Sequence, residues 1–141
     1  MRRLHQISVA IFLRETQAFG VTPVHFAALQ TVASQPGIDQ RSLARTVGLD
    51  TSTITGVIDR LESRGLLVRS ASPEDRRIRQ LTPTDAAIQL LAAIAPSTLS
   101  AQKLFLDPLS EDEQAEFTRM LRKLVTKNND LSRAPSDLGR E

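Results

Sequence analysis

The sequence predicts a mainly α-helical protein with one small β-hairpin. Two short helical patterns lie over residues 40–47 and 50–64, with a tight turn at Gly48 between them. Two apolar runs follow directly, separated by a polar loop that contains arginines, which indicates a hairpin. Further helical patterns lie on both sides of this segment. Helix, turn, helix and hairpin in this order are typical of a winged helix-turn-helix, joined here to additional helical regions.

The N-terminal pattern predicts a helix over residues 3–18 that is apolar around most of its surface. Such a helix must be covered on more than one side, either by a second subunit or by the core of a monomer. A second subunit is the more natural cover at the end of a small chain. The next helix is expected over residues 24–34, because Thr22 and Pro23 form a hydroxyl N-cap followed by proline at the first helical position.

The second helix of the helix-turn-helix has clear signals at both ends. Asp50 is a favourable N-cap, and Gly65 lies where a glycine commonly follows a helix C-terminus. Apolar residues recur between them at the spacing of one narrow stripe, which anchors the helix to the core. The stripe consists of Ile54, Val57, Ile58 and Leu61.

Two short strands are expected at residues 67–70 and 78–81, on either side of the polar loop. Thr82 and Pro83 then repeat the cap-and-proline pattern of a helix start. Asp85 is placed as the capping-box partner of Thr82. We therefore expect the next helix to begin directly at the end of the second strand.

The C-terminal part of the chain predicts two more helices and a tail. The first should run to about Leu106 and bend at Pro96, since proline lacks the backbone N–H that a helix interior needs. Ser110 opens the second with a capping-box pattern, and this helix should end near Lys127. Residues 129–141 are polar and without periodicity, which predicts a flexible tail.

These elements divide into two functional regions. Residues 1–35 and 84–128 are assigned to a helical dimerisation region, and residues 36–83 to a winged helix-turn-helix DNA-binding lobe. Residues 41–79 carry eight arginines against five acidic residues, a net charge of +3, while the whole chain carries only +2. The positive excess therefore lies on the lobe, which favours nucleic acid as a partner.

Composition excludes several classes of protein. The chain has no cysteine, which excludes disulfides, a thiolate metal site and a cysteine redox sensor, and which is compatible with a cytoplasmic location. No apolar run is long enough to span a membrane. No glycine-rich phosphate loop or metal-ligand spacing is present, so we expect no cofactor and no metal. An enzyme has little support, because the two histidines lie far from any nucleophile motif.

The exposed face of the second helix carries small residues that allow close approach to DNA. Serine and threonine can reach base edges or phosphates, and arginine can bind guanine through two hydrogen bonds. Hydroxyl residues are costly in an exposed helix because they compete for backbone hydrogen bonds, so function is a good reason for their presence. An ordinary surface helix is the alternative. The expected DNA-binding residues of this helix are Thr51, Ser52, Thr53, Thr55, Gly56 and Arg60.

The polar loop of the hairpin places Arg76 and Arg77 at its tip. Arginine suits insertion into a narrow, electronegative minor groove, whereas the same loop standing alone would be read as a solvated charged turn. Asp75 is expected to hold the loop in shape by pairing with a nearby arginine, either Arg60 or Arg77. Because the loop follows directly on a helix-turn-helix, we expect its tip to contact DNA.

Taken together, these segments resemble the MarR family of bacterial winged-helix regulators. Residues 43–50 are similar to the family's first motif helix and turn, and residues 52–62 to its recognition helix. Residues 64–67 resemble the exit towards the wing, and residues 75–77 followed by 81–82 resemble the wing and the start of the next helix. The resemblance covers residues 3–128. It implies a homodimer, formed by the N- and C-terminal helices, that binds pseudo-palindromic double-stranded operator DNA.

The resemblance also implies a repressor that is released by a small aromatic carboxylate. Such an effector would lie between the dimer helices and the DNA-binding lobe, where the candidate ligand contacts are His5, Arg14 and His25. Arg14 interrupts an apolar helix and could pair with a ligand carboxylate. Structural roles are the alternative for all three residues, and Arg14 could instead pair with Glu15.

Two other functions use the same pattern. A ligand-independent regulator or activator would bind DNA through the same lobe. A winged-helix protein-interaction module would share the fold, but the arginine tip and the hydroxyl-rich helix would then lack a purpose. Affinity for duplex DNA that falls steeply with salt separates a regulator from an interaction module.

Overall fold

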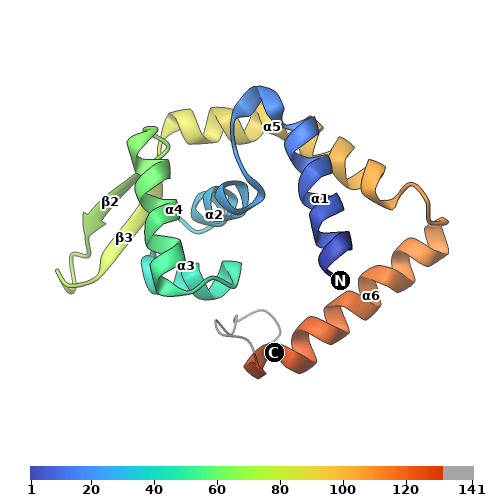
Figure 1. Ribbon diagram of the computed structural model, residues 1–141. Helices are drawn as coiled ribbons and strands as arrows, with labels where there is room; N and C mark the ends of the chain where they lie inside the picture. The colour runs from blue at the N-terminus through green and yellow to red at the C-terminus, as the bar shows by residue number, and fades with distance from the viewer. Residues whose placement is uncertain (132–141) are drawn as a thin grey trace.

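A computed structural model describes residues 1–131 of the chain. The six α-helices of this part are α1 (Arg2–Glu15), α2 (Pro23–Ser34), α3 (Gln40–Val47), α4 (Thr51–Ser63), α5 (Asp85–Leu106) and α6 (Glu111–Asn128). One small sheet contains β1 (Ile38–Asp39), β2 (Leu67–Ala71) and β3 (Arg79–Pro83). Figure 1 shows α2, α3, α4 and the β2–β3 hairpin grouped in one lobe, with α5 leading away from it and α6 lying apart. The mainly helical winged helix-turn-helix is confirmed.

Helix starts follow their capping residues closely. Thr22 accepts a hydrogen bond from the backbone N–H of His25, with Pro23 at the first helical position. Ser110 and Glu113 form the complete capping box that opens α6. These two helices therefore begin where the sequence predicts, because the signals that start them are local.

The helix α5 begins two residues later than the sequence indicates. Thr82 and Pro83 belong to β3, where they pair with Val68 and Leu67 of β2. Proline is tolerated there because its nitrogen faces away from β2, on the side where β1 pairs only with Gln80 and Leu81. The true N-cap is Thr84, whose hydroxyl accepts from Ala87 N–H and donates to the carbonyl of Gly65. The expected capping box between Thr82 and Asp85 is therefore wrong.

The sheet also contains a strand that the sequence does not predict. The antiparallel strand order is β1-β3-β2, and the two residues of β1 pair with Gln80 and Leu81 of β3. A two-residue strand carries no periodicity and becomes visible only through its tertiary partner. β2 and β3 extend one or two residues beyond their expected ends, to Ala71 and Pro83.

The first helix, α1, ends three residues earlier than the predicted residue 18. It ends at Glu15, and a 3-10 turn over Gln17–Phe19 leads to Gly20, which has a positive φ of 62°. Thr16 contributes to this ending, because its buried hydroxyl donates to the carbonyl of Phe12 at 2.7 Å. The last turn of α1 is thus replaced by a compact connection to α2.

The apolar stripe of α4 forms the centre of the core. Ile54, Ile58 and Leu61 are fully buried, and Val57 is nearly so. They pack with side chains from α2, α3 and both long strands. The core therefore fixes α4 on one side and leaves its opposite face to solvent, as the stripe predicts. The partners of the stripe in this core include Leu29, Val32, Leu43, Leu67 and Leu81.

The helices α1 and α6 lie outside this core, and α5 joins it only at its start, through Ala87. α1 packs along α5, which continues through Pro96 without ending. α6 has no buried residue in the described part of the chain, although apolar side chains recur along it at helical spacing. Residues 129–131 form a short 3-10 turn, and the rest of the expected tail lies outside the described residues.

Candidate nucleic-acid interface

The start of α4 is organised by the carboxylate of Asp50. Its Oδ1 accepts from the backbone N–H of Thr53 at 2.8 Å and from the hydroxyl of Ser52 at 2.7 Å. Its Oδ2 accepts from the hydroxyl of Thr53 at 2.9 Å. The hydrogen bonds from Thr53 N–H and from the two hydroxyls hold the pKa of Asp50 down at about 2, so the group is charged at neutral pH.

This arrangement fixes the direction of two hydroxyl protons. A carboxylate can only accept, so Ser52 and Thr53 both donate their protons to Asp50 and keep their oxygen lone pairs free to accept. In the major groove, the complementary donors are the amino groups of adenine and cytosine. The N-terminal turn of α4 therefore presents acceptors to an incoming partner.

We expect the contribution of the Asp50 cap to disappear in acid. The folded carboxyl binds its proton near pH 2, whereas the ordinary value is 3.8, so the charged cap stabilises the protein above pH 4 and this stabilisation is lost as the pH falls towards 2. Asp50→Asn keeps a capping oxygen but cannot ionise. Thermal melts at a series of pH values should show the wild type a few degrees more stable near pH 6, with the difference closing near pH 2. A constant difference would contradict this origin of the cap's effect.

Two of the expected contacts on α4 differ in accessibility. The hydroxyl of Thr55 donates to the carbonyl of Thr51 and accepts from the side-chain amide of Gln40 at 2.7 Å. Thr55 is half-buried and ties α3 to α4, so its oxygen is occupied in the free protein. Gly56 is exposed in the middle of α4, and a Cβ added there would meet no atom within 4 Å. Packing within the protein therefore does not require a glycine at this position, and its small size matters only to a partner that approaches α4 from outside.

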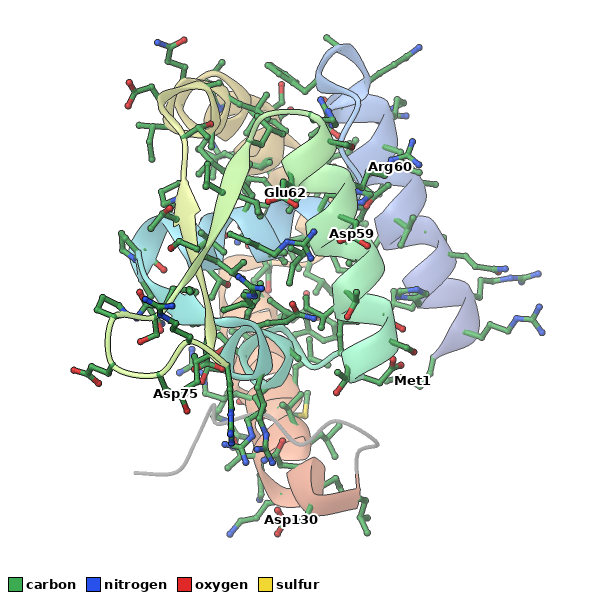
Figure 2. The ribbon with its side chains drawn as sticks, turned by 90° about the vertical axis from the view of Figure 1, so that its left-hand side faces the viewer. Met1, Asp59, Arg60, Glu62, Asp75 and Asp130 are labelled. Atoms are coloured by element: carbon green, nitrogen blue, oxygen red, sulfur yellow. The ribbon has the colours of Figure 1, made fainter. Side chains whose placement is uncertain are left out.

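Arg60 lies on the same face of α4 as Thr53 and Gly56, because it follows them by seven and four residues, and it lines a shallow hollow together with Gly56. Figure 2 shows it on the side towards α1, whereas Glu62 lies on the side towards the hairpin. Burial and the positive charges of Arg60 and Arg64 lower the pKa of His25, at the start of α2. Arg64 itself donates to the carbonyls of Phe19 and Gly20. The C-terminal end of α4 is thus a positively charged region beside the α1–α2 connection.

The hairpin tip is shaped by backbone hydrogen bonds. The Asp75 carboxylate accepts from the backbone N–H of Arg77 at 2.9 Å, and the Asp75 carbonyl accepts from Ile78 N–H. Among the described ion pairs, none joins Asp75 to Arg60 or to Arg77, and Figure 2 places Asp75 and Arg60 at opposite ends of the lobe. The expected ion pair is therefore wrong. Asp75 instead accepts hydrogen bonds from the main chain of its own loop.

A groove between α3 and the hairpin adds arginines that the sequence analysis did not select. Arg77 lies in this groove beside Thr51, and the tip and the start of α4 lie on the same side of the lobe. Arg41 and Arg45 are four residues apart and therefore share one face of α3, a spacing that could have revealed them. The groove is lined by four arginines and a single acid: Asp39, Gln40, Arg41, Ser42, Arg45, Thr51, Arg77, Ile78 and Arg79.

A separate hollow of about 430 Å³ lies between α1, α2 and α5. Its volume is in the range of small-molecule sites. Phe12 and Phe26 lie there with ring centroids 5.8 Å apart, and Phe105 faces them from α5. Polar groups in the lining are hydroxyls and side-chain amides. The complete lining is Ser8, Phe12, Phe26, Gln30, Thr98, Leu99, Ala101, Gln102 and Phe105.

None of the three candidate ligand contacts belongs to the lining of this hollow. The Arg14 guanidinium pairs with Glu15 at 3.1 Å and is largely exposed. His5 is exposed on α1, and the ring nitrogen Nδ1 of His25 lies 2.7 Å from the Thr22 hydroxyl. Within residues 1–131, no three acidic or histidine side chains gather as a metal site, and no helix is long and apolar enough to cross a membrane.

Comparison with known proteins identifies the family. Residues 21–78 match the family model described as MarR family. The transcriptional regulator HosA of Escherichia coli O111:H- is 31% identical over 125 residues, which cover 89% of this chain and 91% of HosA.

Two solved structures match with similar extent. The transcriptional repressor CouR, bound to a 23-mer DNA duplex, has a TM-score of 0.83 and 28% identity, over 88% of each chain. BpsR of Bordetella bronchiseptica, whose DNA binding is regulated by 6-hydroxynicotinic acid, has a TM-score of 0.81 and 28% identity, over 87% of this chain and 93% of BpsR. The chain therefore belongs to the MarR family of DNA-binding, winged-helix transcriptional regulators.

Proposed function

We propose that this protein is a homodimeric repressor that binds a pseudo-palindromic operator and is released by a small aromatic ligand. The observation that carries the proposal is the placement of an acceptor-bearing helix start and an arginine-lined groove on one side of the lobe. The protein acts by binding rather than by catalysis, and it works in the cytoplasm, where the chromosome of a bacterium lies.

The lobe suits simultaneous contact with two grooves of DNA. Ser52, Thr53 and Gly56 lie on the exposed face of α4, which is narrow enough to enter a major groove. Arg76 and Arg77 extend from the hairpin tip towards a neighbouring minor groove. The other three arginines of the groove between α3 and the hairpin, Arg41, Arg45 and Arg79, would hold the phosphates of the strand that separates the two grooves.

An unpartnered apolar stripe supports the homodimer. It follows one face of α6 at the spacing that helix packing requires, and it remains open to solvent in a single chain. α1 also exposes Leu4, Ile7 and Leu13. A second copy of the chain would cover both surfaces and set two α4 helices about one turn of DNA apart. The stripe of α6 comprises Phe117, Met120, Leu121, Leu124 and Val125.

The hollow between α1, α2 and α5 supports a ligand-released mechanism. Its phenylalanines suit the faces of an aromatic ring, and its amides and hydroxyls suit polar substituents. BpsR, which shares the fold over most of its length, responds to an aromatic acid. A carboxylate on the ligand would reach beyond this lining, towards His5, Arg14 or the second subunit. Binding there would favour a spacing of the two lobes that no longer fits the operator.

A titration of operator DNA tests this proposal. The duplex is selected from the DNA upstream of this protein's own gene, and binding is measured at two salt concentrations with and without a panel of aromatic acids that includes 6-hydroxynicotinic acid. We expect tight, salt-sensitive binding that one acid relieves at least tenfold. Phe26→Ala should retain operator binding and lose the relief. Specific binding that no acid relieves would contradict the released repressor and leave a ligand-independent regulator.

A further inference from the structure

One ion-pair cluster joins the hairpin to the recognition helix. The guanidinium of Arg69, on β2, contacts two carboxylates of α4. Its Nη2 lies 2.7 Å from Asp59 Oδ1 and 2.6 Å from Glu62 Oε2, and its Nε donates to the same Glu62 oxygen at 3.0 Å. The backbone N–H of Arg69 donates to the other oxygen of Glu62. A single residue of the strand thus makes four contacts with α4.

Arg69 occupies a position of β2 where an apolar residue would be expected. Side chains alternate along a strand, so Arg69 points to the same face as Leu67, which is buried against α4. An apolar residue at position 69 would extend the core at this point. Arg69 instead keeps its charge at the edge of the core, with 29% of its side chain exposed. Hydrogen bonding to Glu62 raises the pKa of Arg69, and Arg69 lowers the pKa of Glu62.

The cluster lies in the three-stranded part of the sheet, at the base of the hairpin tip. β1 pairs only with Gln80 and Leu81, and Arg69 is opposite Leu81. Gln80 is the last residue of β3 that pairs with β1 on the way to the tip, and beyond it β2 and β3 continue as a short two-stranded ribbon, at Ala71 and Arg79, that carries the loop. Two-stranded ribbons twist more freely than larger sheets and are marginally stable alone. The direction of the ribbon therefore depends on what holds its base.

We propose that Arg69 is a positioning residue that sets the direction of the wing relative to α4, so that the wing tip and α4 engage their two grooves together. Two DNA contacts made by one protein raise its overall affinity only when the geometry between them lets both form at once. The clasp between Arg69, Asp59 and Glu62 supplies that link. Its single positive charge also offsets half of the negative charge of two carboxylates that would otherwise repel DNA phosphates from the recognition helix. The inference rests on the proposed DNA contact of Arg77.

A double-mutant cycle tests the coupling between Arg69 and Arg77. Affinity and its salt dependence are measured for the wild type, Arg69→Met, Arg77→Ala and the double variant, on a duplex that the wild type selects from a random pool. We expect each single variant to bind about tenfold more weakly and Arg77→Ala to reduce the salt slope by about one. In the Arg69→Met background, Arg77→Ala should change neither quantity further. Additive losses in affinity and slope would overturn the positioning role.

Two further variants guard against a general effect on folding. Glu62→Gln weakens the clasp without removing the arginine, and its own cycle with Arg77→Ala should show the same loss of additivity. Arg69→Lys keeps the charge but cannot form the forked contact, so it should restore only part of the coupling. An unchanged affinity for Arg77→Ala in the wild-type background would refute the proposed wing contact, and the positioning role with it. A normal loss for Arg77→Ala with additive cycles would refute the positioning role alone.

Discussion

Gly56→Glu is expected to abolish operator binding, by more than a hundredfold, while the protein remains folded. Gly56 stands in the middle of α4 on its exposed face, and a Cβ added there meets no atom of the protein within 4 Å. A larger side chain is therefore tolerated in the free protein. On DNA, the same side chain would occupy the space that the bases and backbone need, and its charge would repel the phosphates. Fluorescence titration with operator DNA measures the loss.

Matched variants separate the causes of that loss. Gly56→Gln has nearly the same size without the charge, so a loss shared by both variants identifies the steric term. Gly56→Ala should raise the free energy of unfolding by about 0.5–1 kcal/mol, because glycine is less favourable than alanine within an exposed helix. Thermal unfolding confirms that all three proteins fold. Operator affinity within threefold of the wild type for Gly56→Glu would show that this face of α4 does not meet DNA.

Replacing both Leu124 and Val125 of α6 with Glu is expected to convert the proposed dimer into a monomer. Both side chains are more than half exposed in the single chain, so the substitution should leave the fold of the lobe intact. In the dimer, it would place charges in an apolar interface. A monomer contacts one half-site only, and the loss of linked binding should weaken operator affinity by about 10²–10⁴-fold.

Arg122→Glu is the matched control for this prediction. It makes the same change in net charge on α6 but lies away from the apolar stripe. Light scattering and operator titration should show a wild-type dimer for Arg122→Glu and a weakly binding monomer for the double variant. A double variant that remains a dimer with full affinity would mean that α6 does not form the interface.

Sequence alone is sufficient for the elements whose signals are local. The stripe of α4 is buried as its spacing predicts, and Asp50, Thr22 and Ser110 start their helices with the expected hydrogen bonds. Each of these signals involves residues within about one or two helical turns. Local chemistry therefore decides them before any tertiary contact forms.

Tertiary pairing explains the errors. Thr82 and Pro83 have the local pattern of a helix start, but pairing with β2 draws them into β3 and moves the cap to Thr84. β1 exists only because β3 lies beside it. Asp75 finds backbone donors closer than any guanidinium, because its loop turns back on itself. In the first two cases a long-range strand partner overrides a short local pattern, and in the third the turn of the loop supplies a local backbone donor.

The same reason accounts for the parts of the candidate sites that sequence reasoning missed. The clasp of Arg69 depends on the crossing of β2 over α4, and the arginine-lined groove depends on the approach of α3 to the hairpin. The aromatic hollow gathers Phe12, Phe26 and Phe105 from three helices that are distant in the sequence. These contacts join residues of different helices and strands, so no residue spacing along the chain predicts them.

The measurement that tests the central claim most directly is a hydroxyl-radical footprint, with stoichiometry, of the wild-type protein on a duplex selected from a random pool. The account predicts two chains per duplex, two protected half-sites about one helical turn apart, and minor-groove protection next to each. Affinity should fall steeply as salt is raised. One chain per duplex with a single protected half-site, or binding without sequence preference, would contradict a dimer that reads DNA through paired α4 helices and wings.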